Sequence, residues 1–150
     1  MNLGFIGTGN IVSDVITGIF KSKFSFKKII ISPRNKKKAN YLKKKFKRIM
    51  IAKDNQAVID LSDWIFLGVL PRVGENILPK LKFKKNQTVV SFMSTTNYSK
   101  LKRLIGKKAN IVRAIPMPPI RLCKGPVAIF PPNKKIKNFF NNIGTTIEIK

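Results

Sequence analysis

The chain has 150 residues, of which 43% are hydrophobic, so it can bury the core of one domain. Its 31 Lys and Arg residues against 6 Asp and Glu residues give a net charge of +25, which raises nucleic acid or an acidic surface as partners. The absence of His and the single Cys exclude Ser-His and Cys-His catalytic pairs, His-ligated metals and an internal disulfide. Paired-carboxylate chemistry is disfavoured by the same scarcity of acidic residues. We therefore expect a cytoplasmic protein without a metal site, whose reactivity comes from a bound cofactor.

The lysines are spread along the chain, in pairs and triplets that recur in nearly every predicted element. A nucleic-acid surface more often gathers its charge on one element, with aromatic side chains placed for stacking. We interpret the lysines as a solvated coat, part of a general drift toward Lys, Asn and Ile, and expect no specific nucleic-acid site; a dedicated nucleic-acid surface is the alternative. The start of the chain does not have the pattern of a signal peptide. The longest apolar run, Trp64 to Leu70, is far shorter than the roughly 20 residues of a membrane helix, so we expect no membrane contact.

Apolar runs of strand length alternate with longer amphipathic stretches. Strands are predicted at Leu3–Ile6, Ile29–Ile31, Ile49–Ala52, Trp64–Val69, Thr88–Phe92, Ile111–Ile115, Val127–Phe130 and Thr146–Ile149. Helices are predicted at Ile11–Phe20, Asn35–Phe46, Gln56–Leu61, Val73–Leu81, Tyr98–Leu104 and Lys134–Ile143, and a loop at Pro116–Pro119. Continuous apolar strands separated by helices are typical of a parallel sheet covered on both faces. The pattern predicts one doubly wound α/β domain with a mostly parallel sheet over residues 1–150.

A glycine-rich turn joins the first strand to the first helix, with Gly7 and Gly9 in the first two glycine positions of a dinucleotide-binding turn. Gly7 allows the tight bend, Gly9 lets the backbone approach a pyrophosphate, and the following helix directs free N–H groups toward it. Val12 stands in the third position, where Gly or Ala is usual, so the match is incomplete. The turn favours a Rossmann-type nucleotide site, and a glycine turn without a ligand is the alternative.

The end of the second strand indicates which dinucleotide is bound. NAD-specific sites carry Asp or Glu about 20 residues after the glycines, and no carboxylate occurs between Asp14 and Asp54. Ser32 and Arg34 stand there instead, and a hydroxyl followed by a guanidinium suits a 2′-phosphate. We therefore expect NADP(H), unless Arg34 and the neighbouring lysines only cap a solvated helix.

The region from Met1 to Ala128 resembles the N-terminal domain of pyrroline-5-carboxylate reductases, which use NADPH to reduce a cyclic imine to proline. The matching segments, in the family's order and spacing, are Gly4–Ile11, Ser32 with Arg34, Asp54–Asn55, Asp63–Pro71, Val89–Ser91 and Ile111–Pro116. The resemblance implies that the pyrophosphate lies at Ile6, Gly7, Thr8, Gly9, Asn10 and Ile11, the 2′-phosphate at Ser32 and Arg34, and the adenosine ribose at Asn55. It also implies that the nicotinamide lies beside Gly68, Val69, Leu70, Pro71, Met93, Ser94 and Thr95.

The departures from the family pattern lie around the reactive end of the cofactor. Leu70 stands where the family has Lys, Met93–Thr95 replaces a small Ala-Ala-Gly turn, and Met117 replaces an Asn. The resemblance also implies a C-terminal helical domain that forms a dimer and binds the substrate, which we do not find within these residues. We expect a truncated form, a fragment or a divergent relative, completed by a homodimer partner or by that missing domain.

We therefore predict an NADP-dependent oxidoreductase domain of the pyrroline-5-carboxylate reductase type that acts on a small molecule, with no residue that can be named as a general acid. The enzymatic alternatives are a deazaflavin-dependent NADP reductase or a dehydrogenase of the 6-phosphogluconate or hydroxyisobutyrate type. A non-catalytic nucleotide-binding module is the alternative outside enzymes.

Overall fold

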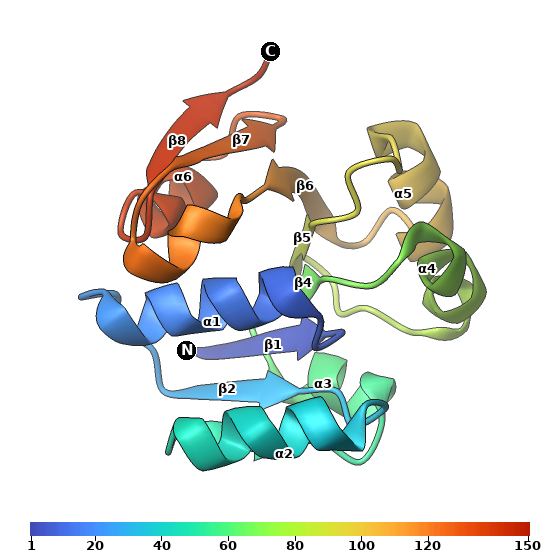
Figure 1. Cartoon of the computed structure of the whole chain (residues 1–150). Helices are drawn as coiled ribbons and strands as arrows, with labels where there is room; N and C mark the ends of the chain where they lie inside the picture. Colours follow the sequence, from blue (N-terminus) through green and yellow to red (C-terminus); the bar gives the residue numbers. More distant parts are fainter.

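The computed structural model describes residues 1–150, which form one eight-stranded sheet with helices on both faces (Figure 1). The strands are β1 (Asn2–Ile6), β2 (Lys28–Ile31), β3 (Ile49–Ile51), β4 (Trp64–Leu67), β5 (Thr88–Ser91), β6 (Asn110–Ile115), β7 (Pro126–Phe130) and β8 (Thr145–Glu148). The helices are α1 (Asn10–Lys21), α2 (Lys36–Lys45), α3 (Asn55–Leu61), α4 (Pro71–Ile77), α5 (Tyr98–Ile105) and α6 (Lys134–Phe140). Two short 3-10 helices, η1 (Leu78–Lys80) and η2 (Pro118–Leu122), complete the elements.

The sheet order is β3-β2-β1-β4-β5-β6-β7-β8, and every neighbouring pair is parallel except β6 and β7. The chain starts in the middle at β1, proceeds to the β3 edge, returns to β4 and continues to the β8 edge. This reversal beside β1 places the carboxyl ends of β1 and β4 next to each other. A crevice opens at such a reversal, and ligands of open α/β sheets bind there. The predicted doubly wound, mostly parallel fold is confirmed.

Two apolar cores form because successive strand residues point to opposite faces of the sheet. In β2, Ile29 and Ile31 belong to the larger core, under α1, α2 and α6, whereas Ile30 belongs to the smaller one, under α3, η1 and α5. The central strands β1, β2, β4 and β5 are apolar on both sides for this reason, as expected of buried parallel strands.

The predicted elements differ most from the observed ones in two segments that contain prolines. The helix predicted at Val73–Leu81 is α4 followed by η1, because Pro71 supplies a preset φ for the first helical turn and Pro79 has no N–H to continue an α-helix. The loop predicted at Pro116–Pro119 contains the start of η2, which packs against α1.

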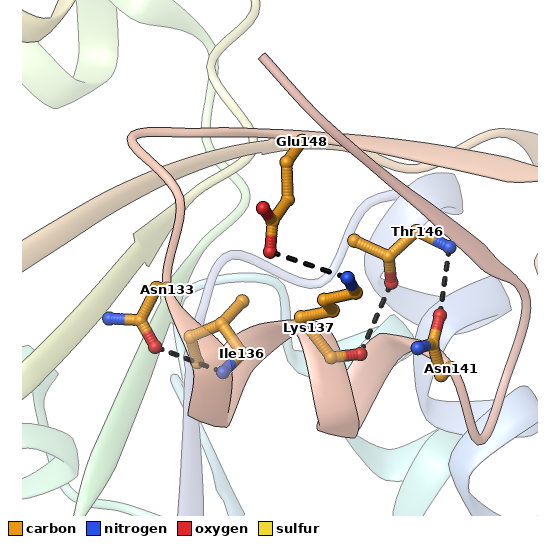
Figure 2. Close-up of polar contacts among 6 residues, drawn as sticks. All are labelled: Asn133, Ile136, Lys137, Asn141, Thr146 and Glu148. Atoms are coloured by element: carbon orange, nitrogen blue, oxygen red, sulfur yellow. Dashed lines mark hydrogen bonds and ion pairs between the residues drawn. The ribbon is translucent and has the colours of Figure 1, made fainter. Parts of the chain in front are cut away.

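The last helix and strand are tied together by side-chain contacts (Figure 2). Asn133 caps α6 by accepting the N–H of Ile136 at 3.1 Å. Thr146 in β8 donates its hydroxyl to the carbonyl of Lys137 at 3.2 Å, and the Lys137 ammonium lies 3.7 Å from a carboxylate oxygen of Glu148. These contacts anchor the edge strand to the helix that covers it. None of the helices is long and apolar enough to cross a membrane.

Candidate nucleotide site

The glycine turn between β1 and α1 has the geometry that its sequence predicts. Gly7 has a φ of +101°, and a Cβ there would overlap the carbonyl oxygen of Gly68, so only glycine fits this bend. Nothing lies within 4 Å of where a Cβ of Gly9 would be, so the backbone at Gly9 faces open space. A ligand can therefore approach the main chain closely at the start of α1.

The first turn of α1 leaves its backbone N–H groups without a capping side chain. Gly9 is the N-cap and accepts the first intrahelical bond, from the N–H of Ser13 at 3.0 Å. The N–H groups of residues 10–12 precede that bond and have no acceptor within the helix. By contrast, α2, α3, α5 and α6 each begin at an Asn or Asp whose side chain accepts a first-turn N–H. An uncapped helix start that faces a cleft is suited to an anion such as a pyrophosphate.

Val12, the departure from the glycine motif, is accommodated by a glycine on the neighbouring strand. Val12 is fully buried, and a Cβ at Gly68, just after β4, would overlap its Cγ2. In the usual motif, a small residue at the third position lets the helix pack closely against the strand. Here that position holds the larger Val12, and Gly68 on the strand side leaves the space for it, so α1 can still pack closely against β4.

The first cleft, which we call the basic cleft, opens between the carboxyl ends of β1, β2 and β4 and has a volume of about 700 Å³. It is lined by Gly7, Thr8, Gly9, Ser32, Arg34, Asn35, Lys36, Lys38, Gly68, Val69, Leu70 and Val73. The charged side chains lie at its β2 side, and all of them are cationic. This end of the cleft therefore has a strong preference for a multiply charged anion.

Ser32, directly after β2, contacts the glycine turn on the other side of the basic cleft. Its side chain is 3% exposed, and its hydroxyl oxygen accepts the N–H of Gly7 at 2.9 Å. Because this bond uses an acceptor lone pair, the hydroxyl proton of Ser32 is free to be donated to a ligand. Asn35 caps α2 by accepting the N–H of Lys38 at 3.1 Å, which fixes the helix that carries the lysines of the cleft.

The second cleft, which we call the uncharged cleft, lies between the carboxyl ends of β4 and β5 and has a volume of about 390 Å³. It is lined by Gly9, Asn10, Ile11, Gly68, Val69, Leu70, Pro71, Phe92, Met93, Ser94 and Thr95, and contains no ionisable side chain. It shares Gly9 and the segment from Gly68 to Leu70 with the basic cleft. The two clefts therefore adjoin along this shared wall, and together we call them the crevice, which is cationic at one end and neutral at the other.

The turn beside β5 is supported from the next strand. Arg113 in β6 donates a guanidinium N–H to the carbonyl oxygen of Ser94 at 2.8 Å, while its Nε is buried without a hydrogen-bond partner. Met93 is 3% exposed, and its sulfur packs where a Cβ of Gly74 would lie. Met93 thus presents little surface to the uncharged cleft, whereas Leu70 is 74% exposed at its mouth.

The crevice brings together most of the residues that the sequence assigns to the cofactor. Two of them lie elsewhere: Ile6 is 1% exposed within the smaller core, and Asn55 starts α3 without lining either cleft. Met117, expected near the reactive end, is exposed at the start of η2 and lines neither cleft. Lining residues that the sequence did not assign are Asn35, Lys36, Lys38, Val73 and Phe92. Lys36 and Lys38 could have been assigned from their position shortly after Arg34. Similar lysine clusters occur throughout the chain, so this position did not distinguish them.

Asp14 is the one group with a perturbed acidity, and it lies on α1 outside both clefts. Burial raises the pKa of its carboxyl, and the nearby Arg121 guanidinium partly opposes that rise. The two residues line a small cavity together with Pro118, Pro119 and Leu122. No three His, Cys, Asp or Glu side chains are grouped so that they could hold a metal ion.

The chain matches the family model described as NADP oxidoreductase, coenzyme F420-dependent, over residues 2–95. It belongs to this family. It is 28% identical over 129 residues to the pyrroline-5-carboxylate reductase of Aquifex aeolicus, covering 86% of this chain and 47% of that protein. The predicted resemblance to the N-terminal domain of pyrroline-5-carboxylate reductases is confirmed. The chain spans about half the length of the curated relatives it matches.

Solved structures show the same fold. The pyrroline carboxylate reductase of Plasmodium falciparum, solved with NADP bound, aligns with a TM-score of 0.85 at 23% identity over 100% of this chain and 58% of that one. An imine reductase of Aspergillus terreus aligns with a TM-score of 0.79 at 16% identity over 99% of this chain and 54% of that one. The fold of the whole chain is therefore shared with these structures.

Proposed function

We propose that this chain binds NADP(H) in the crevice and forms the cofactor-binding part of an NADPH-dependent imine reductase of the pyrroline-5-carboxylate type. The observation that carries the proposal is the charge asymmetry of the crevice, which is cationic beside β2 and free of ionisable side chains beside β5. NADPH has the same asymmetry, with a 2′-phosphate at the adenosine end and a nicotinamide at the other. The match in charge gives the cofactor one orientation.

The residues of the crevice fit the parts of this cofactor. The uncapped N–H groups after Gly9 would bind the pyrophosphate, and Arg34, Lys36 and Lys38 would surround the 2′-phosphate. Ser32 would donate its free hydroxyl proton to the same phosphate while it holds the N–H of Gly7. Ile6 and Asn55 are left out of this assignment, because neither lines the crevice.

The reactive end would be positioned by the uncharged cleft. The turn at Met93–Thr95, held by Arg113, and the segment Gly68–Pro71 would form the walls beside the nicotinamide and exclude water from one side of it. When bound, the cofactor supplies the hydride, and the protein supplies orientation and electrostatics. No ionisable side chain lines this cleft, so we assign no proton donor to this chain.

The names of the relatives, which are pyrroline-5-carboxylate reductases, support a cyclic imine of this class as the substrate, and we propose a role in proline biosynthesis in the cytoplasm. An imine reductase with another substrate is the second candidate. It is favoured by Leu70, which stands exposed where the resemblance implies a Lys.

The experiment is NADPH oxidation by the purified chain with and without pyrroline-5-carboxylate, after the affinity for NADPH has been measured by calorimetry. Much of the rate of such a reaction comes from holding the imine against the nicotinamide, and the resemblance implies that the holding groups lie in a helical domain outside these residues. We expect NADPH binding and a turnover far slower than that of a complete reductase. Fast turnover by a monomer would show that the substrate site is built from these residues, and absence of NADPH binding would reject the proposal.

A further inference from the structure

A second cationic cavity lies at the opposite end of the strands from the crevice. We call it the lysine pocket. It has a volume of about 700 Å³ and is lined by Phe83, Lys84, Lys85, Asn86, Lys107 and Lys108. One lysine pair precedes β5 and the other precedes β6, so the pocket lies at the amino ends of these strands, whereas the crevice lies at carboxyl ends. The two sites share no residue.

The two loops that carry these lysines are fixed to each other by hydrogen bonds. The N–H of Asn86 donates to the carbonyl of Lys108 at 2.8 Å, and the N–H of Asn110 donates to the carbonyl of Gln87 at 2.8 Å. Asn86 adopts a left-handed conformation with a φ of 61°, which turns the first loop toward the second. The backbones of the two lysine pairs are therefore held in one relative position.

The first loop is also anchored from below. Gln87 is buried, and its side-chain amide donates to the carbonyls of Ile59 and Ser62 at 3.0 and 2.8 Å. Its carbonyl oxygen accepts the N–H of Lys84 at 3.0 Å. A loop held by a buried amide loses little conformational freedom when a ligand binds, so the lysine pocket is preorganised.

The charges of the lysine pocket are not compensated by the protein. The ion pairs of the molecule are Lys100 with Glu75 and Lys137 with Glu148, so none of the four lysines of the pocket has a carboxylate partner. The ammonium of Lys84 donates instead to the backbone carbonyl of Asp60 at 3.1 Å. Four like charges around one cavity repel one another, and an anion with several charges relieves this repulsion.

The shape of the cavity indicates the class of anion. Phe83 is the only aromatic residue of the lining and is 8% exposed, so it offers little ring surface for the stacking that single-stranded nucleic acid uses. A concave site between two short loops also suits a compact ligand better than the extended backbone of a duplex. We propose that the lysine pocket binds small solutes that carry consecutive phosphate groups, either inorganic or as the phosphate tail of a nucleotide.

The test is a titration of the full chain with inorganic tripolyphosphate and, separately, with ATP at low salt, followed by amide NMR signals. The signals of Asn86 and Asn110 report on the lysine pocket, and that of Gly9 reports on the crevice. The double substitution Lys107→Gln and Lys108→Gln removes two charges from the pocket. The matched control is Lys134→Gln with Lys135→Gln, an adjacent exposed pair on α6.

We expect the affinity seen at Asn86 and Asn110 to fall by about fivefold or more in the pocket variant and less than about twofold in the control. If ATP binds as tightly as tripolyphosphate, a nucleotide is a source of the ligand; if only tripolyphosphate binds, the ligand is inorganic. Equal weakening in both variants would overturn the proposal, because the binding would then reflect overall charge. If a DNA duplex shifts the same signals and binds more tightly than tripolyphosphate at equal phosphate concentration, the proposal is wrong and the lysine pocket is part of a nucleic-acid surface.

Discussion

The contact between Val12 and Gly68 predicts how the stability of the protein changes when a methyl group is added at residue 68. A Cβ at Gly68 would overlap Val12 Cγ2, while the next atoms, Phe92 Cδ2 and Val12 Cβ, would lie at ordinary contact distance, 3.7 Å. Val12 is fully buried in α1 and β-branched, so it has one strongly preferred rotamer and cannot turn away. Gly68→Ala should therefore cost about 1–3 kcal/mol of unfolding free energy through overpacking.

Removal of the obstructing methyl groups should reverse the sign of this effect. Val12→Ala alone costs about 2 kcal/mol by the usual loss of buried methyl groups. In that background Gly68→Ala should be neutral or stabilising, because the new Cβ fills the vacated space and restricts the unfolded chain. The coupling between the two substitutions should thus be about 1–3 kcal/mol.

The assay is urea unfolding of the four proteins of this cycle, followed by the fluorescence of the buried Trp64. Val127→Ala is the matched control, since it removes the same groups from a fully buried valine in β7. Gly68→Ala should be equally destabilising with or without Val127→Ala. If Val12→Ala leaves the cost of Gly68→Ala unchanged, the two residues do not compensate each other, and the explanation for Val12 in the glycine motif is wrong.

Two further predictions concern polar groups. Ser32→Ala removes the acceptor of the Gly7 N–H, so it should weaken both NADPH and NADH binding by calorimetry; loss of NADPH binding alone would mean that the hydroxyl contacts only the 2′-phosphate. Burial raises the pKa of Asp14 in the folded state, so the stability from this group is present below the carboxyl's ordinary pKa and is lost as pH rises through the raised value. Asp14→Asn should therefore raise the melting temperature at pH 7 more than at pH 4, and an equal change at both pH values would contradict this.

The fold could be predicted from the sequence because its central strands are apolar on both sides and its glycine turn lies at the first strand–helix junction. The boundaries at Pro71 and Pro118 were misplaced because a proline in the loop after a strand can also begin a helix. Local pattern does not distinguish these two roles.

The cofactor residues on the glycine turn were predictable because backbone geometry there is set by neighbouring residues. Lys36 and Lys38 were not, since their sequence neighbourhood resembles that of the other lysines, and only the position of α2 brings them to the crevice. The compensation of Val12 by Gly68 was also out of reach, because it joins residues that are distant in the chain and meet only across the folded sheet.

The central claim is that the cationic end of the crevice binds the 2′-phosphate of NADPH, and the affinity ratio of NADPH to NADH tests it most directly. A desolvated contact between Arg34 and the phosphate is worth about 1.5–3 kcal/mol, which corresponds to a preference for NADPH of about tenfold or more. Arg34→Ala should remove most of this preference and leave NADH binding nearly unchanged, whereas Arg103→Ala, an exposed substitution on α5, should alter neither affinity. Equal affinities of the unmodified chain for NADPH and NADH, measured by titration near physiological salt, would contradict the account.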